Sequence, residues 1–132
     1  MKIFTKAICA LIATATLAFA HGDAAPQKVD TKGLQEVSSD VSKNPFSGNQ
    51  KAIDVGKTAY NQNCARCHGL GAKSGGIAPD LRLLTDGDDE FFLGMVRGGV
   101  VRNGNVYMPP FEGVLNQEAM WAIRAYLITL AK

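Results

Sequence analysis

The spacing of apolar positions along the chain predicts three helices. Apolar residues recur at helical intervals over residues 54–64 and again over residues 90–96, where acidic residues precede the stretch and two glycines follow it. A third helical stretch starts after Asn116, a residue suited to an N-cap, and runs toward Leu130. No stretch alternates convincingly between apolar and polar residues, as a half-buried strand would. The pattern therefore predicts an all-α fold.

The start of the chain has a different pattern. Lys2 and Lys6 precede an apolar run over residues 7–19, and Ala18-Phe19-Ala20 forms an A-x-A cleavage site. The apolar run is shorter than the ~20 residues that a membrane-spanning helix needs. We therefore expect residues 1–20 to be a cleaved signal peptide, which leaves an exported, soluble protein without a membrane anchor.

Composition limits the classes of partner. The chain has 132 residues, of which 46% are hydrophobic and 20% are charged, as in a single soluble domain. Lys2 and Lys6 account for the formal net charge of +2, so the remainder of the chain is electrically balanced. A balanced charge gives no electrostatic reason to expect nucleic acid or an anionic membrane surface as a partner.

Residues 21–50 differ from the rest of the exported chain. They contain few large apolar residues and many Gly, Pro, Ser, Asn and Asp residues, so they cannot form a core of their own. We expect this segment to be an N-terminal extension that lies over a domain formed by residues 51–132. The apolar side chains that can hold it there are Val29, Leu34, Val37, Val41 and Phe46.

Two cysteines, Cys64 and Cys67, remain after the predicted cleavage. A cysteine pair in an exported protein suggests a disulfide or a redox-active dithiol, and both are alternatives here. However, His68 follows directly and completes C-x-x-C-H, the attachment motif of c-type haem. Two thiols one helical turn apart can add to the two vinyl groups of a haem, with the adjacent imidazole beneath the iron. We predict one covalently bound haem c, with His68 as an iron ligand.

The second axial ligand of the iron is predicted to be a methionine. Met120 recurs with apolar residues of the last predicted helix, and Met95 lies in the apolar stretch of the second, so packing in the core is expected for both. Met108 instead precedes Pro109 and Pro110, which fix the backbone and prevent a helix. Rigid presentation suits a weak thioether ligand, so we predict that Met108 binds the iron from a stiff loop.

These residues resemble the motifs of the class I cytochromes c, from the C-x-x-C-H run at residues 64–68 to the Met-Pro-Pro-Phe run at residues 108–111. The resemblance covers residues 53–132 and implies the class I fold, in which helices and loops wrap around one covalent haem. It also implies that Gly56 and Tyr60 pack the first helix against the last.

Residues 78–81 resemble the family's loop whose proline carbonyl accepts a hydrogen bond from the haem-ligating histidine. This implies that role for Pro79, although Ala78 replaces the usual glycine, because the accepting group is a backbone carbonyl. We expect Leu81 to pack against the haem. Arg82 can neutralise a haem propionate, and the alternative is an ordinary surface arginine.

A narrower resemblance concerns residues 59–70 and 106–113. They are similar to the small periplasmic cytochromes c that accept electrons from quinoprotein alcohol dehydrogenases, which depend on pyrroloquinoline quinone. The resemblance implies a periplasmic single-electron carrier that is not an enzyme, with such a dehydrogenase as donor and an oxidase or another cytochrome as acceptor. The alternative is a haem c domain with an open or labile sixth site that acts in catalysis or gas sensing.

Overall fold

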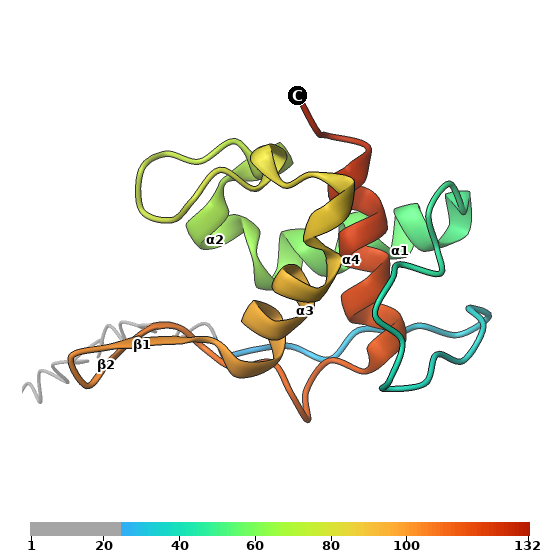
Figure 1. Cartoon of the computed structure of the whole chain (residues 1–132), viewed down its shortest axis with the longest axis horizontal. Helices are drawn as coiled ribbons and strands as arrows, with labels where there is room; N and C mark the ends of the chain where they lie inside the picture. The colour runs from blue at the N-terminus through green and yellow to red at the C-terminus, as the bar shows by residue number, and fades with distance from the viewer. Residues whose placement is uncertain (1–24) are drawn as a thin grey trace, which may run out of the picture.

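The computed structural model describes residues 25–132, whose backbone is mainly helical (Figure 1). The predicted signal peptide lies outside the described residues. In chain order the helices are α1 (Gln50–Asn63), α2 (Ala65–His68), η1 (Leu70–Ala72), η2 (Leu81–Leu83), η3 (Asp86–Asp88), α3 (Asp89–Gly98) and α4 (Gln117–Ile128). Strands β1 (Val100–Arg102) and β2 (Asn105–Met108) form an antiparallel hairpin between α3 and α4. Within this part of the chain, no helix is both long enough and apolar enough to cross a bilayer.

The core is built around α4, in which every residue from 119 to 127 is buried. α1 lies against one side of α4, and α3 packs against another (Figure 1). The closest approach of α1 to α4 is at Gly56, where a Cβ atom would lie 1.9 Å from the carbonyl oxygen of Ala122. Along the same contact the rings of Tyr60 and Tyr126 are tilted at 55°, with their centroids 5.6 Å apart. The class I packing of the first helix on the last is therefore present.

The three predicted helices are present, with small shifts at their ends. α1 begins at Gln50, earlier than predicted, because Asn49 caps it by accepting a hydrogen bond from the Ala52 amide at 3.2 Å. The first turn of α1 is largely polar, so apolar spacing does not reveal it. At α4, Asn116 accepts a hydrogen bond from the Ala119 amide at 2.9 Å, which confirms the predicted cap.

The β1–β2 hairpin was not predicted. Its strands flank Asn103 and Gly104, whose φ values of 51° and 77° form a tight turn with two left-handed residues. Val101, Val106 and Tyr107 are all exposed, so neither face of the hairpin is covered by the core. Because no face is buried, the sequence lacks the alternation of a half-buried strand. The Asn-Gly pair was the available signal, since it is the commonest sequence at such turns.

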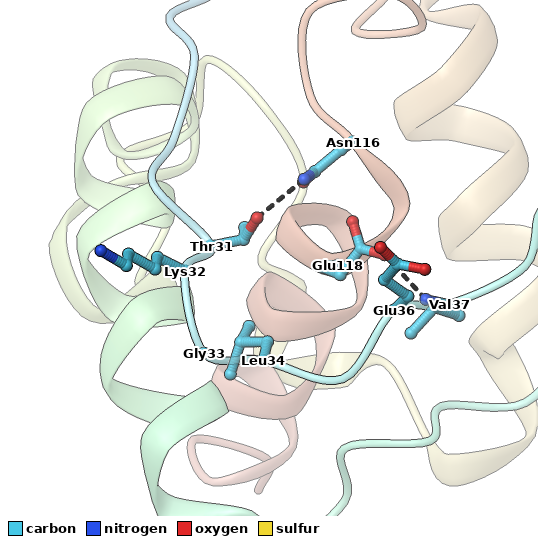
Figure 2. A pocket seen from close by; sticks show the side chains of 8 residues that line it. All are labelled: Thr31, Lys32, Gly33, Leu34, Glu36, Val37, Asn116 and Glu118. Carbon is cyan, nitrogen blue, oxygen red and sulfur yellow. Dashed lines mark hydrogen bonds between the residues drawn. The ribbon is translucent and has the colours of Figure 1, made fainter.

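Residues 25–49, here called the strap, contain no helix or strand and lie across the helices (Figure 1). The expected apolar contacts are present: Phe46 is buried, and the four other predicted side chains are partly buried against the core. Figure 2 shows the strap crossing the start of α4, where the two enclose a pocket. There Asn116 donates to the Thr31 hydroxyl at 2.7 Å, and the Val37 amide donates to a Glu118 carboxylate oxygen at 2.7 Å.

A buried ion pair joins the strap to both α3 and α4. The Arg124 side chain is fully buried, and its Nε donates to Asp89 Oδ1 at 2.7 Å. The other Asp89 oxygen, Oδ2, accepts a hydrogen bond from the Asn44 amide of the strap at 2.8 Å. Arg124 also donates through Nη2 to the Thr85 carbonyl. Removing one partner would leave a buried charge unpaired, which typically costs about 3–5 kcal/mol.

The α1–α4 contact can be tested by adding a single methyl group. Gly56→Ala is expected to lower the free energy of unfolding by about 3 kcal/mol, the upper end of the usual cost of overpacking, because the new Cβ would overlap the α4 backbone. The control is Lys57→Ala, at the exposed neighbouring position of α1. It should change the free energy of unfolding by less than about 0.5 kcal/mol. Urea unfolding of the two variants measures both effects, and equal effects would refute the contact.

Candidate haem site

The two cysteines and the histidine lie on one short helical turn. α1 ends at Asn63, and Cys64 starts the turn by accepting hydrogen bonds from the amides of Cys67 at 3.1 Å and of His68 at 2.9 Å. Both thiols are free; Cys64 is partly buried and Cys67 is exposed. The turn therefore offers two sulfur atoms and a neighbouring imidazole from three positions of one helical turn.

The ring of His68 has a fixed orientation. The side chain is buried, and its Nδ1 lies 2.8 Å from the carbonyl oxygen of Pro79. Because a carbonyl oxygen can only accept, Nδ1 carries the proton and donates it to this bond. The lone pair of the neutral ring is then on Nε2, the nitrogen available to a metal ion. The bond expected between His68 and Pro79 is confirmed.

The loop that carries Pro79 is held by further hydrogen bonds. The Tyr60 hydroxyl donates to the Gly69 carbonyl at 2.6 Å, which fixes the chain as it leaves α2. Ser74 donates through its hydroxyl to the Ala78 carbonyl, directly before Pro79. Tyr60 therefore serves two purposes, because its ring packs on α4 while its hydroxyl supports the segment after His68.

Burial raises the pKa of two groups near the turn. Burial, reinforced by the neighbouring thiol of Cys67, raises the pKa of the Cys64 thiol to about 12. Burial also raises the pKa of the Tyr60 hydroxyl well above its ordinary value, with Cys64 as the next contributor. This environment favours an uncharged sulfur at Cys64, and a thioether is uncharged.

Arg82 has a partner within the chain. Its Nε and Nη2 donate to the two carboxylate oxygens of Asp80 at 2.9 and 2.6 Å. The Lys132 ammonium lies 3.2 Å from Asp80 Oδ2. The hydrogen bonds from Arg82 are the main cause that holds the pKa of Asp80 well below its usual range. A haem propionate near Arg82 would share this guanidinium with Asp80. Leu81, between the two, is partly buried against the core.

The three methionines lie in different surroundings. Met120 is fully buried in α4, as expected. Met95 was expected in the core but is 36% exposed, because α3 turns Phe92, Leu93 and Val96 inward and leaves Met95 on another face. Met108 is partly buried against the core and is the last residue of β2. The stiff loop expected around Met108 is therefore a strand end followed by two prolines.

Backbone contacts with the end of α3 hold the segment around Met108. Val100 pairs with Met108 across the hairpin, and the Phe111 amide donates to the Val96 carbonyl at 2.9 Å. Gly99 permits this arrangement: its φ is +67°, and a Cβ there would lie 2.4 Å from the Met108 carbonyl oxygen and 2.7 Å from the Pro110 nitrogen. The sequence identified Gly99 only as a helix stop. Its close approach to Met108 is visible only in three dimensions.

The donor set suits a c-type haem. Two free thiols lie on one turn, the adjacent imidazole presents Nε2, and a thioether stands on a segment clamped at both ends. In the view of Figure 1, α2, α3 and the hairpin all lie on one side of α4. The described residues hold no group of three or more His, Cys, Asp or Glu side chains placed to bind a metal ion by themselves. The two thiols, the imidazole and the thioether are the donors that a c-type haem uses.

Comparison with known proteins gives the family. The family model described as cytochrome C oxidase, cbb3-type, subunit III, matches residues 51–127. Cytochrome c550 of Pseudomonas aeruginosa is 50% identical over 127 residues, a match that covers 91% of this chain and 88% of that protein. The chain belongs to the cytochrome c family. As a class I c-type cytochrome it carries covalently bound haem c and acts as an electron carrier, not as an enzyme.

Two solved structures share this cytochrome c fold. One is the quinohemoprotein alcohol dehydrogenase ADHIIG from Pseudomonas putida HK5, 39% identical with a TM-score of 0.56. This match covers 76% of the present chain but 15% of the dehydrogenase chain. The other is cytochrome CL of Methylophaga aminisulfidivorans MPT, with a TM-score of 0.59. This match covers 76% of this chain and 70% of the cytochrome CL chain. At 19% identity, cytochrome CL supports the fold alone.

The close approach at Gly99 gives a prediction for this cytochrome. Gly99→Ala should lower the free energy of unfolding by more than the ~1–3 kcal/mol that its backbone conformation alone would cost, because the Cβ also collides with the Met108 segment. Gly104→Ala is the matched control, since Gly104 also has a positive φ, of +77°, but has no atom near its Cβ position. Urea unfolding compares the two. A loss for Gly99→Ala no larger than for Gly104→Ala would contradict the clash.

Proposed function

We propose that this cytochrome is a periplasmic single-electron carrier with a His/Met-ligated haem c. Cys64 and Cys67 form the two thioether bonds, His68 Nε2 and the Met108 sulfur bind the iron, and the Pro79 carbonyl orients His68. The hydrogen bond between His68 Nδ1 and the Pro79 carbonyl is the observation that carries this proposal. It fixes the orientation of the ring and leaves Nε2 free to bind the iron. The haem supplies a one-electron couple between ferric and ferrous iron.

The chain's own residues account for electron transfer without catalysis. With both His68 and Met108 as ligands, a haem iron would have no coordination position left for oxygen or peroxide. A thioether ligand favours ferrous iron and raises the reduction potential, while the Pro79 bond keeps His68 in one tautomer. The clamped segment around Met108 limits movement between the two oxidation states. These features distinguish an electron carrier from a domain with an open sixth site.

Exposed apolar side chains support contact with a haem. Phe91 and Met95 lie one turn apart on α3 and are 58% and 36% exposed, although most of the large apolar side chains of α3 are buried. We propose that the haem covers this face, since a domain of this size needs the cofactor as part of its core. Met95 is then the competing sulfur. Leu81 is partly buried against the core, and we propose that it packs against the haem as well. Arg82 is proposed to reach a propionate while it keeps its bonds to Asp80.

The relatives and the surface near α2 support a proposal for the partner class. The similar ADHIIG is a quinohemoprotein alcohol dehydrogenase, and the matching family model describes a subunit of a cbb3-type oxidase. We propose a quinoprotein alcohol dehydrogenase as the electron donor and an oxidase or another cytochrome as the acceptor. Leu70 and Ile77, in the segment after α2, are about 80% exposed, which suits the apolar centre of a short-lived contact. Lys73 and Arg102 provide a charged rim.

The sixth ligand is tested by replacing each competing methionine. Met108→Ala is expected to abolish the far-red charge-transfer band of the ferric protein, lower the potential and let the ferrous protein bind carbon monoxide. Met95→Ala should keep the band and lower the free energy of unfolding by less than about 2 kcal/mol, because Met95 is partly exposed. If Met95→Ala lost the band and Met108→Ala kept it, the ligand would be the other sulfur.

The donor is tested by mixing the oxidised cytochrome with a reduced quinoprotein alcohol dehydrogenase and timing the haem reduction. Ile77→Glu should slow reduction much more than Lys73→Glu does, with the equilibrium potential nearly unchanged, because it places a charge in the apolar centre of the contact. Added salt should have a small effect. A rate that fell steeply with ionic strength and ignored Ile77→Glu would indicate a charged docking patch instead.

A further inference from the structure

The segment that carries Met108 is also held by the side chain at the end of α3. Arg97 lies in the last turn of α3, and its backbone carbonyl accepts a hydrogen bond from the Glu112 amide at 3.4 Å, a long contact. The Arg97 side chain adds an ion pair without a hydrogen bond, because Nε lies 3.4 Å from a carboxylate oxygen of the exposed Glu112 side chain. Pro109 and Pro110 join Met108 to this clamp and make the intervening backbone stiff.

The same guanidinium reaches two other parts of the chain. Its Nη2 donates to the carbonyl oxygen of Ser39 in the strap at 2.9 Å and to the side-chain oxygen of Gln117, the first residue of α4. Arg97 therefore connects the end of α3 with the strap, the start of α4 and the chain that follows Met108. The side chain is 29% exposed, so these contacts are partly shielded from water.

The Ser39 carbonyl, which accepts the hydrogen bond from Arg97, belongs to a part of the strap that is held in place. On one side of Ser39, the Val37 amide donates to Glu118 in α4, as Figure 2 shows. On the other side, the Asn44 amide donates to Asp89 in α3. Because the strap is tied to the domain on both sides of Ser39, the Ser39 carbonyl is a rigid acceptor. A rigid acceptor orients the Arg97 guanidinium before it meets Glu112.

We propose that Arg97 is a positioning residue for the sixth iron ligand, and that the strap supports it through Ser39. This inference rests on the proposed ligation of iron by Met108. An iron–thioether bond is weak, so its lifetime depends on how firmly the protein holds the sulfur in place. Arg97 contacts the chain that follows Met108, whereas the hairpin holds the chain that precedes it. The strap thereby acts on the haem site without providing a ligand.

The test measures how fast added imidazole replaces the sixth ligand of the ferric cytochrome. Arg97→Gln removes the charge and most of the hydrogen bonds, and is expected to raise this rate by about tenfold or more, since bonds from a charged group are lost. The far-red band should weaken in parallel. Lys57→Gln is the control for the lost positive charge, because Lys57 is an exposed residue of α1 and lies outside the hairpin and the end of α3. Its rate should stay within about threefold of wild type.

A second control separates positioning from general loss of stability. Ile123→Val removes packing between α4 and α1, so it should lower the urea midpoint while leaving the imidazole rate within about threefold of wild type. Amide hydrogen exchange provides an independent readout. In Arg97→Gln the amides of Phe111 and Glu112 should exchange faster, and the amide of Leu127 in the core should not.

The outcomes distinguish the inference from the proposed function. If Met108→Ala kept the far-red band, the ligation itself would be wrong. If Met108→Ala lost the band but Arg97→Gln bound imidazole at the wild-type rate, only the role of Arg97 would be overturned. It would also be overturned if Ile123→Val accelerated imidazole binding as much as Arg97→Gln did.

Discussion

The close packing of α1 on α4 is the constraint on which the rest of the structure depends. Without a side chain at Gly56, the two backbones approach closely enough for a Cβ to overlap the Ala122 carbonyl. That approach brings Tyr60 onto Tyr126, a tilted aromatic pair that adds about 0.5–1.5 kcal/mol beyond its buried area. Because α2 begins directly after α1, the same contact sets where the haem-binding turn starts. The Tyr60 hydroxyl then fixes the chain after His68.

A second constraint is electrostatic and lies on the other side of α4. Arg124 is charged and fully buried, so it requires Asp89 at the start of α3, and Asp89 in turn accepts the Asn44 amide from the strap. A segment with little apolar surface is thereby tied to the domain by hydrogen bonds in addition to Phe46. The strap covers helices that would otherwise expose apolar surface, and its path past Ser39 places it in contact with Arg97. The N-terminal extension is therefore an integral part of the fold around the site.

The protein chain fixes the candidate site both around His68 and around Met108. On the histidine side, the Pro79 carbonyl selects the tautomer of His68, and burial raises the pKa of the Cys64 thiol. On the methionine side, the hairpin and the last turn of α3 restrain Met108 through backbone contacts that Gly99 makes possible. Both arrangements exist in the protein chain itself. An electron carrier benefits from this rigidity, because residues that do not move between oxidation states add little reorganisation to electron transfer.

The sequence by itself determined the local features. Helical spacing predicted α1, α3 and α4, and Asn116 predicted its cap, because these depend on neighbours within one or two turns. The C-x-x-C-H run likewise predicted the haem turn, since its chemistry is contained in five consecutive residues. Only the tertiary structure decided which surfaces are covered and which distant segments meet. It leaves Met95 and the hairpin exposed, and it joins the strap to the Met108 segment through Arg97. Such contacts depend on which surfaces the folded backbone brings together, and the spacing of residues along one chain does not record that.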